Sequence, residues 1–317
     1  MLGPVWFTLP DGREIQPLAV APWSGDPKDR LDPLPPIIRS LRGEFPCIPF
    51  GAPEARPDLP PRWTQGVETG AAPVDAFLHG YSANHDWHLV DEAEGEITVA
   101  IDYPADHPVR RVERRIAAAD GAGLTIDLAI EAARRVSIPV GVHPIFDLPG
   151  NPGAARLEIP SLRGVRTFPM PVEDSSILLP DQWAGSLAAL ATRDGGRVDF
   201  STLPLGVPTE ELLSVELGDG AVRLAFPDER YAIDLEWDIN VFSQCLIWFS
   251  GRGRQAYPWC GRFQAIGIEP VRSAFDLGVE VSANAGSPFA RAGIPTQLAL
   301  DPGARFTTRY AIRLSGL

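Results

Sequence analysis

The chain of 317 residues carries 41 acidic and 28 basic residues, a net charge of −13 at pH 7, and 44% of its residues are hydrophobic. Because no block of lysine and arginine interrupts this acidic sequence, its composition argues against nucleic acid and anionic membranes as partners. No apolar run reaches the roughly 18 residues that a membrane-spanning helix needs. The hydrophobic content suffices for a large core, and we expect a single domain over residues 1–317.

The N-terminal segment, Met1 to Thr8, has neither a basic region nor a long apolar stretch, so we expect no signal peptide. Three cysteines, Cys47, Cys245 and Cys260, show no metal-ligand spacing. Such a sparse, odd set is typical of reduced core thiols, which indicates a cytoplasmic protein.

The first half of the chain alternates between short strands and proline-rich segments. Val5–Leu9 and Arg13–Leu18 predict a hairpin around Asp11-Gly12, a dipeptide favoured in tight turns. Two proline-rich stretches, residues 21–36 and 53–73, are predicted to be loops. The apolar run 42–51 holds too many prolines for a central strand, so we expect irregular chain packed on the core.

Period-2 alternation dominates from residue 87 onward, and helical periodicity is scarce. A short helix is predicted at Leu187–Thr192, and Ile294–Leu300 and Arg305–Leu314 are expected to close the chain as an antiparallel pair. The other predicted strands are Trp87–Val90, Ile97–Tyr103, Val109–Ala119, Leu124–Ala132, Arg135–Val142, Leu213–Leu217, Val222–Phe226, Tyr231–Trp237, Gln244–Phe249 and Phe263–Glu269. Many short strands at regular spacing predict an all-β fold, a large antiparallel β-sandwich.

Glu269 is the residue that first indicates a site. It follows the apolar strand that begins at Phe263, and Pro270 is expected to end that strand at once. A carboxylate at the end of a buried strand is costly unless it is hydrogen-bonded or used in chemistry. The alternative is a structural glutamate, which is common at strand ends.

Two histidines stand in similarly constrained positions. His79 precedes Gly80, which permits tight backbone geometry, and His143 precedes Pro144, whose ring keeps it extended. A histidine in a fixed pose suits proton transfer or contacts to hydroxyl groups, because it titrates near neutral pH. The alternative for each is a hydrogen-bonded core histidine.

Other polar residues give weaker signals. His85 and His88 have a spacing that a metal site could use, but no further ligands accompany them, and a polar loop is the simpler interpretation. Arg42 could hold hydroxyl groups through its planar fork or form a structural ion pair. The Gly-Arg-Gly-Arg run at residues 251–254 resembles a phosphate loop only in composition, and a hairpin turn explains it better.

Several stretches, in the right order from residue 42 to the C-terminus, resemble the galactose mutarotase-like superfamily of aldose 1-epimerases and hexose-6-phosphate mutarotases. They are Arg42-Gly43-Glu44-Phe45-Pro46-Cys47-Ile48-Pro49-Phe50-Gly51, His79-Gly80-Tyr81, His143-Pro144-Ile145-Phe146, Ile268-Glu269-Pro270 and Leu300-Asp301-Pro302-Gly303.

The resemblance implies a β-supersandwich with a sugar-sized groove and no cofactor or metal. It implies that Glu269 is the general base and His143 the general acid that open and close an aldose ring, so that the α and β anomers interconvert. His79 and Arg42 would hold the substrate, and the arginine could instead be Arg39. The partner would be a small free sugar.

Three positions depart from the family pattern. Glu44 stands where the phosphosugar branch has a second glycine, and Ala83 stands where that branch has an arginine. The second change argues against a phosphorylated substrate, although a hexose-6-phosphate mutarotase stays an alternative. The aspartate that contacts sugar hydroxyls in the galactose mutarotases has no clear match here, and Asp238 is a candidate only by its position in a late strand. These departures also leave open a non-catalytic sugar-binding or sensing module.

Overall fold

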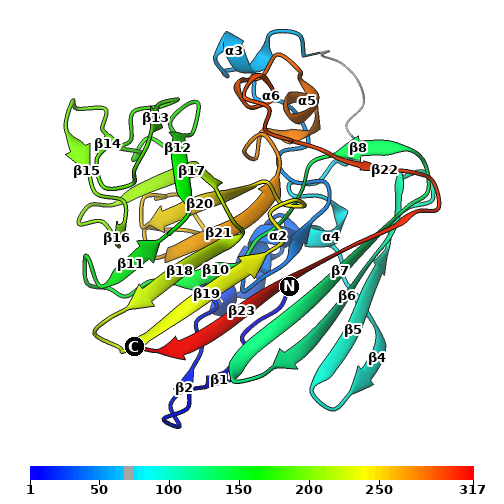
Figure 1. Ribbon diagram of the computed structural model, residues 1–317, viewed down its shortest axis with the longest axis horizontal. Coiled ribbons are helices and arrows are strands. Elements are labelled where there is room, and N and C mark those ends of the chain that lie inside the picture. The colour runs from blue at the N-terminus through cyan, green and yellow to red at the C-terminus, as the bar shows by residue number, and fades with distance from the viewer. Residues whose placement is uncertain (68–73) are drawn as a thin grey trace.

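The computed structural model describes residues 1–67 and 74–317, and the last part of the loop expected at 53–73 lies outside the described residues. Two antiparallel sheets pack face to face (Figure 1). The larger sheet has nine strands, in the order β16 (Thr202–Leu203), β11 (Ala155–Glu158), β18 (Ala221–Phe226), β19 (Tyr231–Trp237), β23 (Arg305–Gly316), β7 (Ala122–Ala132), β6 (Val109–Ala119), β5 (Glu96–Asp102) and β4 (His88–Ala93).

The second sheet has eight strands and supports the site described below. Its order is β13 (Trp183–Ala184), β12 (Leu162–Thr167), β17 (Thr209–Leu217), β20 (Gln244–Gly251), β21 (Gln264–Arg272), β9 (Val140–Val142) and β3 (Pro46–Cys47), and β10 (Ile145–Asp147) also pairs with β21. Three two-stranded sheets complete the strands: β1 (Phe7–Thr8) with β2 (Glu14–Ile15), β8 (Val136–Ile138) with β22 (Leu298–Leu300), and β14 (Leu190–Ala191) with β15 (Arg197–Val198). The all-β sandwich expected from the sequence is confirmed.

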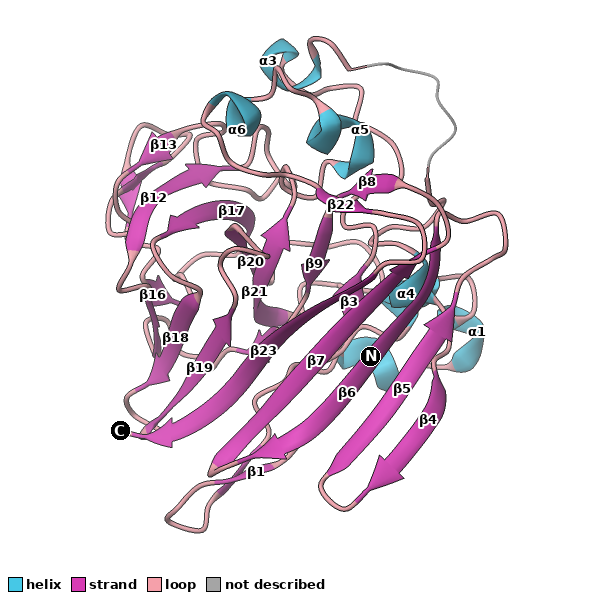
Figure 2. Ribbon diagram, turned by 45° about the vertical axis from the view of Figure 1, so that its right-hand side comes forward, coloured by secondary structure: helices cyan, strands magenta, loops and turns pink. Residues whose placement is uncertain are grey.

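All helices of the described residues are short, and they lie outside the two sheets, with α3, α5 and α6 at one end of the sandwich (Figure 2). None of them is long and apolar enough to cross a membrane. They are η1 (Pro22–Gly25), α1 (Lys28–Leu31), α2 (Pro36–Arg39), α3 (Pro61–Thr64), α4 (Tyr81–Asn84), α5 (Gly278–Ala283) and α6 (Pro288–Arg291).

The eight-stranded sheet is buried on both faces. Side chains such as Leu213 and Ile247 pack into the core between the two sheets. Their neighbours along the strands, Leu212 and Leu246, point to the other face because successive side chains of a strand alternate. That second face is covered by the irregular segment around Phe45 and by the short helices, and it bears the cavity.

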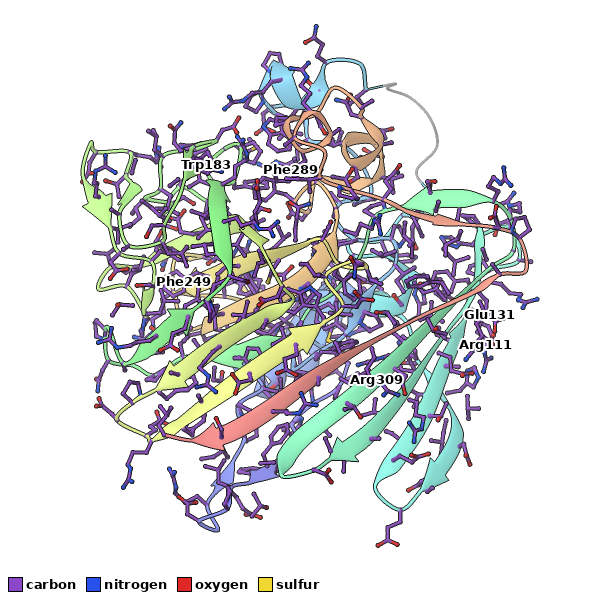
Figure 3. All side chains as sticks on the ribbon, in the orientation of Figure 1. Arg111, Glu131, Trp183, Phe249, Phe289 and Arg309 are labelled. Carbon is purple, nitrogen blue, oxygen red and sulfur yellow. The ribbon has the colours of Figure 1, made fainter. Side chains whose placement is uncertain are left out.

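The nine-stranded sheet has a core face and a charged outer face. Outward-pointing arginines pair with carboxylates on neighbouring strands. Arg309 on β23 bonds Asp127 on β7 at 2.6 Å, and Arg305 reaches Glu113 and Glu131 at 2.6 and 2.7 Å. Figure 3 shows Arg111, Glu131 and Arg309 on the strands of this sheet. Each such exposed pair contributes at most about 1 kcal/mol.

One ion pair is instead fully buried between the sheets. Glu44 is 0% exposed and forms an ion pair with Arg114 of β6, which is 4% exposed. The hydroxyl of Tyr310 on β23 donates to Glu44 Oε1 at 2.6 Å. Glu44 therefore fastens the irregular segment to the larger sheet, which explains its presence where the phosphosugar branch has glycine.

Four predicted elements are wrong. Leu187–Thr192 is not helical but forms a turn and strand β14, which pairs with β15. The stretch 21–36 contains η1 and α1, and the described part of the stretch 53–73 contains α3, rather than loop alone. The segment 294–300 does not pair with the last strand, because β22 pairs with β8, while β23 pairs with β7 and β19.

Pro270 also does not end its strand, which continues to Arg272. The N–H of Ile268 donates to the carbonyl of Pro144 at 3.0 Å, and residue 270 faces the same side of the strand. On that side β10 pairs with residues 265–267 and β9 with residues 271 and 272. The proline therefore falls between two short partners, where no ladder hydrogen bond is needed from it.

Cys47 and Cys245 are buried free thiols, as expected, but Cys260 is exposed, so the expectation of a core thiol there is wrong. Cys260 lies in the turn between β20 and β21, with a positive φ of 48°. Its neighbour Trp259 packs inward instead.

Candidate active site

A cavity of about 600 Å³, including the solvent-filled space at its mouth, opens on the second face of the eight-stranded sheet. Glu269, His143 and His79 all line it, so the fold brings three sequence-predicted residues together from distant segments.

Glu269 lies on β21, in the middle of the sheet, and its side chain is almost completely buried. Its partner in β20 is Leu246, and both point to the cavity face. Burial raises the pKa of Glu269 well above its usual value, and the nearby carboxylate of Asp276 raises this pKa further. A carboxyl group in this setting accepts a proton readily near neutral pH.

His143 follows β9 directly. Its backbone N–H donates to the carbonyl of Phe45 at 2.9 Å, and its ring stacks on the Phe45 ring with centroids 4.8 Å apart. Nε2 lies 3.3 Å from Oε1 of Glu269, while the buried Nδ1 has no hydrogen-bond partner among the described residues. Burial lowers the pKa of His143 well below its usual value, and the neighbouring His79 lowers this pKa further.

At 3.3 Å, Glu269 and His143 are close enough to share one proton. Burial disfavours the carboxylate and the imidazolium alike, while their attraction at 3.3 Å favours both charges. The ion pair, carboxylate with imidazolium, and the neutral pair, carboxyl with imidazole, differ only in the position of one proton. The pair can therefore act as acid and base without a change of net charge. Gly267 leaves room for the pair, because a Cβ there would lie 2.7 Å from Glu269 Oε1.

His79 is a neutral hydrogen-bond donor. The N–H of Gly51 donates to Nδ1 at 3.3 Å, which leaves the proton on Nε2. Burial lowers the pKa of His79 to about 4, so the ring carries no charge at neutral pH. Its φ of 59° is followed by a φ of 78° at Gly80, where a Cβ would lie 2.3 Å from the carbonyl oxygen of Ile48. Only glycine allows this close approach.

Arg42 is not among the residues that line the cavity. It is partly buried, and its Nε donates to the carbonyl of Ser40 at 3.3 Å. Arg39, the last residue of α2, does not line the cavity either, and Asp238 lies in an exposed turn where it bonds Asn240. The structure therefore places neither arginine, nor Asp238, beside Glu269, His143 and His79 at the cavity.

The arginine at the cavity is Arg254, from the run that the sequence assigned only to a turn. Its Nε donates to Glu173 at 3.0 Å and lies 3.4 Å from Glu210, and its guanidinium packs over the ring of Trp259 at 4.6 Å. Within residues 1–67 and 74–317, neither Nη has a hydrogen-bond partner. Three neighbours thus hold Arg254 while its terminal donors stay free for a ligand.

Glu210 helps to hold Arg254 in place. It is buried on β17, and it accepts hydrogen bonds from Trp248 Nε1 at 2.7 Å and from Ser250 Oγ at 3.0 Å. Burial raises its pKa to about 7, against an opposing effect of Arg254. The signal that could have found it is the pair Glu210-Glu211 in an otherwise apolar strand, because buried carboxylates need a reason to be there.

Asp276, just after β21, is a further carboxyl group at the cavity, and burial raises its pKa. The described residues hold no group of three histidine, cysteine or acidic side chains that could bind a metal ion. His88 lies 3.9 Å from Asp102, while His85 stacks on Tyr81 with ring centroids 3.7 Å apart. The two histidines of the alternative metal site therefore have separate partners.

No family model and no curated protein matches the sequence. Solved structures do match. A protein of Escherichia coli K12, described as a candidate aldose 1-epimerase, is 19% identical with a TM-score of 0.60, and the match covers 89% of this chain and 86% of that one. A GalM/aldose epimerase homologue from Caenorhabditis elegans is 12% identical with a TM-score of 0.59, covering 98% and 91%.

A Synechocystis protein is 13% identical with a TM-score of 0.60, and the match covers 95% of this chain and 85% of that one. At identities this low, the matches show the fold but not the reaction. In agreement with the sequence resemblance, the chain has the galactose mutarotase-like fold.

Proposed function

We propose that this protein is an aldose 1-epimerase that interconverts the α and β anomers of a free, unphosphorylated sugar. The observation that carries the proposal is the buried pair Glu269–His143, with Oε1 and Nε2 3.3 Å apart, at the cavity on the second face of the eight-stranded sheet. Anomer exchange needs one base and one acid next to the anomeric carbon, and nothing else.

The reactive form is the ion pair, in which the proton that burial favours on Glu269 has moved to Nε2 of His143. The carboxylate takes the proton of the anomeric hydroxyl, the C1–O1 bond becomes a carbonyl, and the bond between C1 and the ring oxygen breaks. The ring oxygen receives the Nε2 proton of His143, which gives the open-chain aldehyde, a neutral carboxyl group and a neutral imidazole. After rotation about C1–C2, the same steps in reverse close the ring on the other face of the carbonyl.

The surroundings of the pair suit both halves of this cycle. The unpaired Nδ1 and the buried position of His143 make its imidazolium a strong acid, which favours transfer to the ring oxygen. The raised pKa of Glu269 makes it a competent base. His79, through Nε2–H, and Arg254, through its Nη groups, would hold substrate oxygens, and Arg254 takes the role first expected of Arg42.

A hexose-6-phosphate substrate is the less favoured alternative. Among the described residues that line the cavity, Arg254 is the one arginine or lysine, and Glu173 and Glu210 already neutralise it. Ala83, at the position of the arginine in the phosphosugar branch, is buried on α4. A phosphate dianion would thus lack uncompensated cations.

The test is the rate of mutarotation of freshly dissolved α-anomers of glucose, galactose, arabinose and xylose, followed by polarimetry. Glu269→Gln should lower kcat/KM at least roughly 100-fold, because general acid–base catalysis contributes about 10²–10⁴. Glu92→Gln, an exposed change on β4, is the matched control and should behave as wild type.

Circular dichroism would establish that the Glu269→Gln protein is folded. Equal rates for Glu269→Gln and wild type would refute the assigned role. Saturable sugar binding to wild type without rate acceleration would favour the non-catalytic sugar-binding module instead.

A further inference from the structure

Besides the polar side chains of Glu269, His143, His79, Arg254 and Asp276, the described lining of the cavity is aromatic or aliphatic. Helix α2 and the residue shortly after it contribute Ile37, Ile38 and Leu41 to the lining, and none of the polar side chains of that segment reaches it. Leu78 contributes at the mouth, where it is 37% exposed. One whole segment of the wall therefore offers no hydrogen-bonding side chain to a ligand.

The floor of the cavity continues this apolar surface. Leu212 on β17 is the register partner of Trp248 on β20, and Trp248 in turn opposes Gly267, two residues before Glu269. All of these positions face the cavity side of the sheet. The nearest carboxyl group on β17 is Glu210, whose two oxygens already accept from Trp248 and Ser250. The side chain that β17 presents to a ligand is thus a leucine.

The remaining polar groups are few. Once Glu269 and His143 are engaged at the anomeric carbon and the ring oxygen, His79, Arg254 and Asp276 are the polar lining residues left in the described chain. An ordinary hexopyranose carries four more hydroxyl groups. A hydroxyl pressed against Leu212 or α2 would lose water and find no partner, which weakens binding, whereas a methyl or methylene group there buries apolar surface favourably.

From this lining we infer that the preferred substrate is a deoxy-aldose, a sugar in which a hydroxyl of the fully hydroxylated aldose is replaced by hydrogen. The inference rests on the proposed function, since it names the substrate class of the same site. A site without a partner for a hydroxyl group discriminates against the sugar that carries it.

The experiment compares D-glucose and D-galactose with their 2-, 3-, 4- and 6-deoxy derivatives. Catalysed mutarotation is measured by NMR exchange, and each rate is divided by the uncatalysed rate of the same sugar. At least one deoxy sugar should exceed its parent roughly 10-fold in kcat/KM. Parents that equal or exceed every deoxy derivative would overturn the inference while leaving the epimerase intact.

Binding gives a second readout that does not depend on catalysis. Trp248 and Trp259 line the cavity, so sugar binding should change their fluorescence. If no sugar is turned over, the proposed epimerase fails, and the affinities alone then decide the inference: tighter binding of a deoxy sugar than of its parent supports it. Equal affinities, or no binding of any sugar, overturn it.

Leu212→Asn places a hydrogen-bonding group on the floor and should lower the preference for the deoxy sugar roughly 10-fold. The milder Ile38→Thr should shift the preference in the same direction if Leu212→Asn does not fold. Leu89→Asn, an equivalent change at an exposed position of β4, is the matched control and should leave the preference unchanged. An unchanged preference in folded variants of both cavity positions would contradict the inference.

Discussion

Glu44→Gln should destabilise the protein strongly, although this residue contacts no ligand. The change removes the carboxylate that pairs with Arg114, the one such partner among residues 1–67 and 74–317, and leaves the charge of this 4% exposed arginine buried with neutral acceptors. The amide oxygen of glutamine can still accept from Tyr310, so the loss is mainly electrostatic. Removing one partner of a buried ion pair costs about 3–5 kcal/mol. Against a typical total of about 5–15 kcal/mol, this is a large share.

The assay is urea unfolding followed by tryptophan fluorescence, with Glu44→Gln, Arg114→Met and the double variant measured side by side. Each single change should lower the free energy of unfolding by about 3–5 kcal/mol. The double variant should lose clearly less than the sum, because it removes both buried charges together. Single losses below about 1 kcal/mol, or additive losses in the double variant, would refute the reasoning.

Two further predictions concern Arg254, which lines the cavity, and its neighbour Glu210. Arg254→Leu should lower kcat/KM roughly 10–100-fold, because a charged hydrogen bond to the substrate is lost. Arg252→Leu, a change at a solvent-exposed position of the same turn, is the control and should leave kcat/KM unchanged. Equal effects of the two changes would contradict a role of Arg254 in substrate binding. Burial raises the pKa of Glu210 from 4.5 to about 7, so the folded protein retains a proton that the unfolded chain releases in this interval. Its contribution to the free energy of unfolding is full below pH 4.5 and declines as pH rises to about 7, by about 3 kcal/mol. Glu210→Gln should flatten that decline in urea titrations at several pH values, and parallel curves for the two proteins would contradict the shift.

Local patterns were sufficient to predict much of the fold. Val109–Ala119 and Tyr231–Trp237 were predicted to the residue, because one face of each strand is apolar and the other charged or half-buried. The pairing of Leu298–Leu300 with β8 could not be predicted, because it joins segments about 160 residues apart. Pro270 was misjudged for a similar reason: whether a proline ends a strand depends on which neighbour needs its missing N–H.

Part of the cavity lining was predictable, at positions where backbone geometry and chemistry coincide. His79, His143 and Glu269 each stand beside a glycine or proline that fixes the chain, and all three reach the cavity. Arg42 and Arg254 carry the same charge, and each stands next to a glycine in the sequence. Only the folded chain reveals that the second lies over Trp259 while the first bonds the carbonyl of Ser40.

The charged outer face of the nine-stranded sheet helps to fix the register of its strands. If β23 slid by one residue against β7, Arg309 would turn toward the apolar interior, and Tyr310 would turn toward water. Among the described residues, the inward-pointing Arg114 pairs with the buried carboxylate of Glu44, whereas Arg305 and Arg309 have their carboxylate partners on the outer face. Each exposed pair contributes little to stability by itself, yet a shift of the register by one residue would bury the charges of all these arginines at once, which is costly.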